Sequence, residues 1–216
     1  MRVGVVYESL FGDTREIAEA IAAGIREADP AANPACSPAA EADPHLAQAD
    51  VLIVGAPTHF LGLPSRRSRM MQLRYRNDSG ACYITGPVPR LTGNLAGSRP
   101  RQAGRAAGSQ PRPGAPEGVR EWLERLPQAA AGACAAAFDT RLDTLMSGSA
   151  AREIGHSLSS RGYQLVARPE GFSVTDFEGP LAEGERERAR QWGVEVYRAA
   201  GGHRRAQPGR GGRHGA

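Results

Sequence analysis

Glu8-Ser9-Leu10-Phe11-Gly12-Asp13-Thr14 separates two segments of different periodicity. Before it, residues 3–7 (VGVVY) form an unbroken apolar run, which predicts a strand buried on both faces, as in a parallel sheet. After it, Ile17, Ile21 and Ile25 recur at every fourth position among Ala, Glu and Arg, which predicts an amphipathic helix. The seven residues therefore join the end of a strand to the start of a helix.

A loop at this position has the chemistry of an anion site. Backbone N–H groups at a helix start lack partners within the helix, and the helix dipole places partial positive charge there. Ser9 and Thr14 add hydroxyl donors, and Gly12 lets the backbone curl closely round a ligand. The alternative is an ordinary strand-to-helix turn, with Asp13 as N-cap and Glu16 completing a capping box.

Length and composition predict one soluble domain. The chain has 216 residues, of which 40% are hydrophobic, enough to fill one core. It contains no apolar run of about 18 residues and no secretory signal pattern at its start, so we expect a cytoplasmic protein. Cys36, Cys82 and Cys134 are widely spaced and odd in number, which fits neither a disulfide framework nor a zinc or redox pair, so they are expected to be buried or idle thiols.

Charge is unevenly distributed along the chain. All 27 basic residues are arginine, and the net charge is +4. Residues 66–112 hold ten arginines and one acid, and residues 201–216 hold four arginines and no acid, which leaves −9 on the remainder. The sequence thus predicts an acidic body that carries a basic insert and a basic tail.

Strand and helix patterns alternate along the rest of the body. Residues 51–54, 134–138 and 163–167 are expected strands, and the helical patterns fall at 119–126, 150–158 and 189–196. Gly162 is expected to end the second of these helices in a left-handed conformation. This alternation predicts a five-stranded parallel sheet with helices on both faces.

Three segments lack a clear pattern. Residues 29–48 contain four prolines, so a strand near 33–37 is only weakly indicated. The Arg/Gly/Pro-rich insert, 66–115, and the basic tail, 201–216, are expected to be disordered, which places one domain over 1–200. The insert has few aromatic residues among its arginines, so nucleic acid is an unlikely partner.

Three loops would meet at one sheet edge, because each follows the carboxyl end of an expected parallel strand. Open parallel sheets bind ligands beyond this edge. Residues 3–28, with the loop 8–14, resemble the start of a flavodoxin-type domain. The stretch 56–62 (APTHFLG) and the segments 138–141 and 179–181 resemble short flavodoxin-domain proteins of GC-rich bacteria. The resemblance covers roughly residues 1–65 and 116–198. It implies a flavodoxin-like doubly wound α/β fold that binds FMN.

The resemblance also implies which residues surround the cofactor. The first loop would hold the FMN phosphate, the second would lie along the ribityl chain and ring edge with Phe60 stacked on the ring, and the third would border the other side of the flavin. The implied residues are Ser9, Leu10, Phe11, Gly12, Asp13 and Thr14, then Pro57, Thr58, His59, Phe60 and Gly62, and finally Asp139, Thr140 and Arg141.

Some of these residues have other interpretations. Flavodoxins usually carry Asn where this chain has Asp13, and a carboxylate repels a phosphate that an amide could bind. His59 is more often a residue that packs a loop than a catalyst. Trp122 and Trp192 lie on apolar helix faces and are expected in the core.

The function implied is electron transfer by bound FMN with redox partner proteins or a small quinone-like acceptor. No catalytic residues of the chain are expected. Two alternatives stay open. One is a flavin-dependent quinone or protoporphyrinogen-type oxidoreductase, in which His59 or Arg141 would help to hold substrate. The other is a flavodoxin-shaped binding protein that has lost FMN and uses the basic insert as its contact surface.

Overall fold

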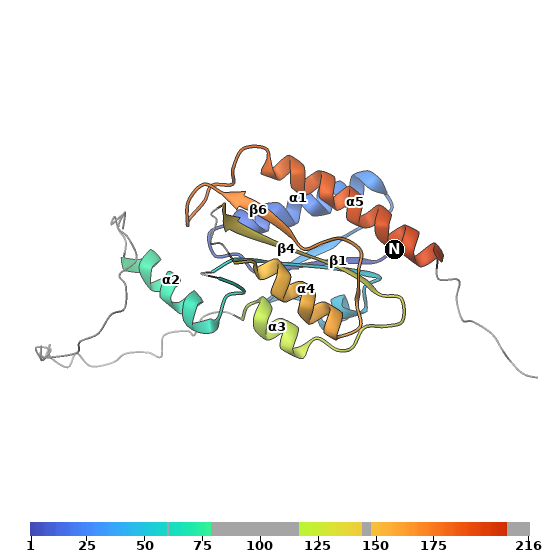
Figure 1. Cartoon of the computed structure of the whole chain (residues 1–216), viewed down its shortest axis with the longest axis horizontal. Coiled ribbons are helices and arrows are strands. Elements are labelled where there is room, and N and C mark those ends of the chain that lie inside the picture. The colour runs from blue at the N-terminus through green and yellow to red at the C-terminus, as the bar shows by residue number, and fades with distance from the viewer. Residues whose placement is uncertain (60, 79–116, 144–147, 207–216) are drawn as a thin grey trace, which may run out of the picture.

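The computed structural model describes residues 1–59, 61–78, 117–143 and 148–206 (Figure 1). Strands and helices alternate along the described chain. The strands are β1 (Val3–Tyr7), β2 (Ala35–Pro38), β3 (Val51–Pro57), β4 (Cys134–Leu142), β5 (Gln164–Leu165) and β6 (Glu170–Val174). The α-helices are α1 (Asp13–Ala28), α2 (Arg66–Asp78), α3 (Val119–Arg125), α4 (Ala150–Ser160) and α5 (Glu185–Ala206), and one 3₁₀ helix, η1, covers Pro44–Gln48.

The strands form one parallel sheet in the order β2-β1-β3-β4-β5. β6 also pairs in parallel with β4, further along it, so β5 and β6 together form one interrupted fifth strand. The order 2-1-3-4-5 is that of flavodoxin-like doubly wound domains. The expected fold class is therefore confirmed.

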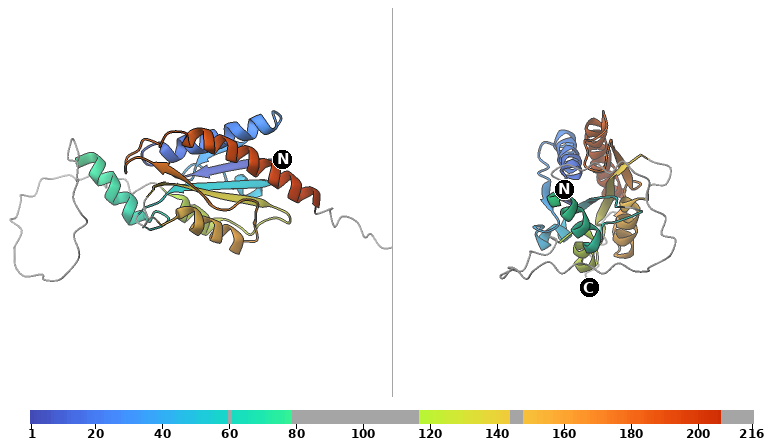
Figure 2. Two further views of the ribbon diagram at one scale, coloured as in Figure 1. Left: turned by 45° about the horizontal axis from the view of Figure 1, so that its top comes forward. Right: turned by 90° about the vertical axis from the view of Figure 1, so that its left-hand side faces the viewer.

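Helices cover both faces of this sheet. Helices α1 and α5 lie on one face, and α3 and α4 lie on the other (Figures 1 and 2). Each face has its own apolar core, because alternate residues of β1 point in opposite directions: Val5 belongs to one core and Val6 to the other. Trp192 and Trp122 are buried in the two cores, as their helical spacing predicts.

A ring cluster anchors α5 to the sheet. Phe138, Phe172 and Trp192 contact one another edge to face, with ring centroids 6.2–6.4 Å apart. Phe138 also lies over Gly55 of the neighbouring strand, where a side chain would collide with the ring at 2.1 Å. This close approach explains why β3 carries a glycine.

The insert and the tail differ from their expected disorder where they are described. Residues 66–78 form helix α2, whose Arg69 is almost fully buried among polar partners. Residues 201–206 continue α5, whose apolar face extends to the buried Ala200. The remaining residues of both segments, 79–116 and 207–216, lie outside the described residues.

Smaller expectations have clear outcomes. The weakly indicated strand near residues 33–37 is β2, which pairs with β1 from Ala35 to Pro38. Gly162 has a φ of 86°, the left-handed conformation predicted for the end of α4. Cys36 and Cys134 are free thiols, and Cys82 lies outside the described residues. None of the helices described in the structure is long and apolar enough to cross a membrane.

Candidate functional site

The first loop, residues 8–14, leaves the start of α1 open. Gly12 is the N-cap, and no side chain caps the helix there. The Gly12 N–H donates to Ser9 Oγ at 3.1 Å, and its carbonyl accepts from the Glu16 N–H at 2.9 Å. The alternative with Asp13 as N-cap is therefore wrong, since Asp13 lies within the first helical turn. Backbone N–H groups of this turn remain available to an anion.

Gly12 gives the first loop its shape. Its φ of 117° is one that residues with side chains rarely adopt. A Cβ placed there would meet no atom within 4 Å, so the space beside it is open. The glycine is thus required by backbone conformation, and it leaves room for a ligand close to the backbone.

The side chains of Thr14 and Asp13 point to neighbouring segments. Thr14 Oγ1 lies 2.7 Å from Thr140 Oγ1, and both threonines are buried. The Asp13 carboxylate lies against Gly179, where a Cβ would be 2.5 Å from Asp13 Oδ1. Burial raises the pKa of Asp13. Ser9 is therefore the hydroxyl residue that this loop leaves partly exposed.

The second loop, residues 57–62, is a tight turn beside the first. His59 and Gly62 exchange two backbone hydrogen bonds, of 2.9 and 3.1 Å. The Thr58 N–H donates to the Thr140 carbonyl at 2.8 Å, and Thr58 Oγ1 accepts from the Ala150 N–H at 3.0 Å. Leu61 stands at the tip with 71% of its surface exposed. Phe60, the predicted stacking residue, lies outside the described residues.

His59 is packed into the protein. It is 8% exposed, and its Nδ1 lies 3.2 Å from Ser68 Oγ of α2. Burial, together with the nearby positive charge of Arg69, lowers the pKa of His59 to about 4. The imidazole is therefore neutral near pH 7 and holds the second loop against α2.

The residues predicted to border the flavin lie mainly inside the protein. Asp139 is fully buried and accepts hydrogen bonds from Ser149 Oγ at 2.8 Å and the Ala151 N–H at 2.9 Å. Arg141, whose side chain is 34% exposed, pairs with Asp139 at 3.2 Å. These contacts fix the start of α4 to the end of β4. Residues 144–147, between those two elements, lie outside the described residues.

The structure thus brings the three loops together at the carboxyl edge of the sheet. Thr140 joins them, because it contacts Thr14 of the first loop and accepts from Thr58 of the second. Figure 2 shows this edge from in front in its right-hand view, with α2 standing before it. The open start of α1 therefore lies beside the other two loops.

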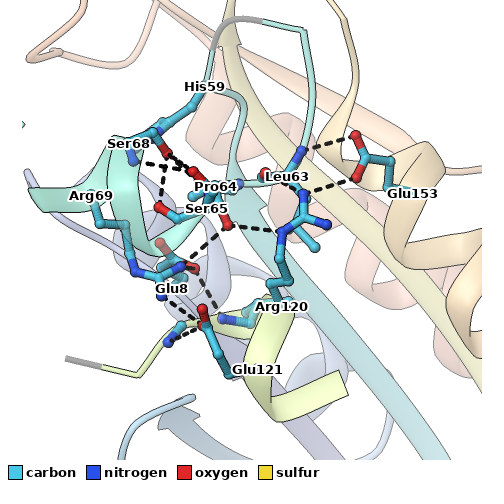
Figure 3. A network of polar contacts seen from close by, with 12 residues as sticks. Glu8, His59, Leu63, Pro64, Ser65, Ser68, Arg69, Arg120, Glu121 and Glu153 are labelled. Carbon is cyan, nitrogen blue, oxygen red and sulfur yellow. Dashed lines mark hydrogen bonds and ion pairs between the residues drawn. The ribbon is translucent and has the colours of Figure 1, made fainter. Parts of the chain in front are cut away.

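A buried charged cluster beside the first loop was missed by the sequence reasoning (Figure 3). Arg69 of α2 is 1% exposed and pairs with Glu121 of α3 at 2.6 Å and with Glu8 at 3.7 Å. The sequence offered one signal, namely Glu8 placed directly after the buried strand β1. Arg69 gave none, because it stands among many other arginines.

Cavities among the described residues lie elsewhere. One of about 530 Å³ is lined by the carboxyl-terminal ends of α1 and α5, including Asp29 and Tyr197, at the opposite edge of the sheet. Its lining also includes Arg198, Arg204 and Arg205, and it lies away from the three loops. A second, of about 130 Å³, lies between α3 and α4. No cluster of possible metal ligands occurs within the described ranges.

Solved structures share this fold at low sequence identity. Flavodoxin 1 from Bacillus cereus superposes with a TM-score of 0.56 at 16% identity, covering 92% of this chain and 98% of that one. A flavodoxin from the domain Archaea gives 0.52 at 14%, over 93% and 99% of the two chains. A short-chain flavodoxin associated with a non-canonical PDU bacterial microcompartment gives 0.53 at 13%, again over 93% and 99%. No protein-family model and no curated protein matches the sequence. The chain therefore has the flavodoxin fold.

Proposed function

We propose that this protein binds FMN non-covalently at the three-loop edge and acts in electron transfer. The observation that carries the proposal is the open amino-terminal end of α1, with Gly12 as N-cap and no capping side chain. It lies at the sheet edge where doubly wound proteins bind ligands. Flavodoxins are among the proteins with the same fold.

The residues of the first loop fit the phosphate of FMN. Backbone N–H groups of the first turn of α1 and the Ser9 hydroxyl are donors, and the open space beside Gly12 admits a phosphate. The buried pair Thr14 and Thr140 holds this turn against the sheet. Asp13 is the unfavourable member, because its carboxylate adds negative charge to the same turn.

The other two loops would flank the flavin. In this proposal Pro57, Thr58, His59 and Gly62 shape one side of the site, and Asp139 and Arg141 fix the other. FMN, when bound, accepts and releases electrons at its ring system. The chain's own residues orient it, limit its exposure to water and set the surrounding charge.

The direct test is reconstitution. We expect the purified full-length chain to show visible flavin absorbance, or to acquire it when FMN is added, and to quench FMN fluorescence on binding. Protein that stays colourless and leaves the fluorescence of added FMN unchanged would support the alternative of a binding protein without cofactor, and the proposal would be wrong.

A second measurement separates a carrier from an oxidoreductase. A carrier exchanges electrons with a partner reductase and gives negligible turnover with NAD(P)H and a quinone alone. Sustained quinone reduction by NAD(P)H would instead identify an enzyme. We favour the carrier, because the neutral, buried His59 holds a loop and is not placed to handle protons of a substrate.

A further inference from the structure

The guanidinium of Arg69 connects the surroundings of the first two loops. Arg69 Nη1 donates to the Pro64 carbonyl at 3.2 Å, just after the second loop. The same nitrogen lies 3.7 Å from Glu8 Oε2, and Glu8 directly precedes Ser9. Arg69 Nη2 donates to Glu121 Oε2 at 2.6 Å. Figure 3 shows these three contacts converging on one side chain.

Glu8 is an unusual residue for this position. It is 6% exposed, and its Oε2 accepts a hydrogen bond from the Val119 N–H at 2.9 Å. Its Oε1 has no hydrogen-bond partner among the described residues. Gly118 leaves space for the pair, because a Cβ there would lie 2.3 Å from Glu8 Oε2 and 2.5 Å from Arg69 Nη1. The carboxylate is therefore enclosed, with Arg69 as its closest cation.

The charges of this cluster do not cancel. Glu8 and Glu121 carry two negative charges and Arg69 one positive charge, which leaves −1 beside the first loop. Arg120 of α3 also acts on Glu8 electrostatically, from a greater distance. Burial raises the pKa of Glu8, and the charge of Arg69 opposes that rise. Removing Arg69 would leave a second uncompensated charge next to the first loop, because Glu8 directly precedes Ser9.

We propose that Arg69 is a specificity-determining residue of the cofactor site, which offsets the charge of Glu8 and thereby sets the preference for a flavin that carries a phosphate. The inference rests on the proposed function. If Arg69 has this role, the preference for FMN over riboflavin depends on the net charge of the Glu8–Arg69–Glu121 cluster. Geometric damage to the second loop, which Arg69 holds through the Pro64 carbonyl, would instead weaken both ligands together.

The test compares four proteins: the wild type, Arg69→Met, Glu8→Gln and the double variant. Affinities for FMN and riboflavin are measured by fluorescence quenching at about pH 8, where a phosphate monoester, with a second pKa of about 6, is a dianion. The FMN-to-riboflavin affinity ratio should be highest in Glu8→Gln and lowest in Arg69→Met. It should be nearly equal in the wild type and the double variant, since both clusters carry −1.

Each unit of charge should change the FMN-to-riboflavin affinity ratio roughly fivefold, as for charges that interact in a partly screened site. Arg67→Met is the matched control, because Arg67 is exposed on the same helix, and its ratio should stay within about twofold of the wild type. If Arg69→Met does not fold, the ranking of the FMN-to-riboflavin affinity ratios of the other three proteins still tests the proposal.

Equal losses for FMN and riboflavin in Arg69→Met would overturn the proposal and leave Arg69 a purely structural role. A ratio in Glu8→Gln no higher than in the double variant would overturn it as well. Wild-type protein that binds neither flavin would instead refute the proposed function itself, so the two failures are distinguishable.

Discussion

The carboxylate of Asp13 lies in the first turn of α1, beside the N–H groups that the FMN phosphate would approach. Flavodoxins usually have Asn there, and an amide carries no charge. We expect Asp13→Asn to tighten FMN binding roughly fivefold to tenfold, because it removes a charge that repels the phosphate. A fluorescence titration measures the change.

Glu195→Gln provides the control for Asp13→Asn. It removes a charge of the same sign from an exposed position in α5, away from the first loop, and should leave the affinity for FMN unchanged. FMN affinity that is equal or weaker in Asp13→Asn would show that the carboxylate does not oppose the phosphate.

His59 should make the protein sensitive to acid. Its folded pKa of about 4 lies below its usual 6.5, so the stability it contributes is complete above about pH 6.5 and is lost as pH falls toward 4. Between pH 7 and pH 5 this loss is about 2 kcal/mol of the free energy of unfolding. Urea unfolding at the two pH values should show this fall in the wild type and a smaller one in His59→Gln.

The exposed His156 of α4 supplies the comparison for His59. His156→Gln should keep the acid sensitivity of the wild type. If His59→Gln lost as much stability as the wild type between pH 7 and pH 5, the burial of a neutral imidazole would not be the cause.

At the scale of elements, α1 and α5 pack so closely that their backbones touch. A Cβ at Gly24 of α1 would lie 1.9 Å from the Arg190 carbonyl oxygen, and one at Gly193 of α5 would lie 2.4 Å from that of Ile21. Gly24→Ala should therefore lower the free energy of unfolding by about 2–3 kcal/mol, because the helices must separate. Denaturant titration would measure it.

Gly202 is the matched control for Gly24, since it is also helical but a Cβ there meets nothing within 4 Å. Gly202→Ala should raise stability by about 0.5–1 kcal/mol through helix propensity alone. Equal effects of the two substitutions would contradict close packing of α1 against α5.

At the scale of the whole molecule, charge is separated between an acidic body and basic segments. The chain outside residues 66–112 and 201–216 carries −9. Because negative charge disfavours adding electrons to bound FMN, we expect a potential below that of free FMN, by on the order of 60 mV for one electron. Potentiometric titration measures it, and a potential above that of free FMN would refute the expectation.

Local patterns in the sequence were enough to predict most of the fold. The apolar run of β1 predicts a buried strand, and the four-residue spacing of Ile17, Ile21 and Ile25 predicts a helix. The alternation of strand and helix patterns that follows predicts a parallel sheet covered by helices. The meeting of three loops at one edge follows from the same order. These features depend on neighbours within a few turns of chain, which a sequence displays directly.

Only the tertiary structure decided where the loop side chains point. The Thr14 side chain contacts Thr140, and the buried Asp139 fixes the start of α4. Gly12 is the N-cap of α1, a position that the alternative interpretation of the loop gave to Asp13. Arg69 stood in a segment read as disordered, yet it is buried against Glu8 and Glu121, 61 and 52 positions away. Such pairings depend on burial and charge balance between distant segments, and no local periodicity records them.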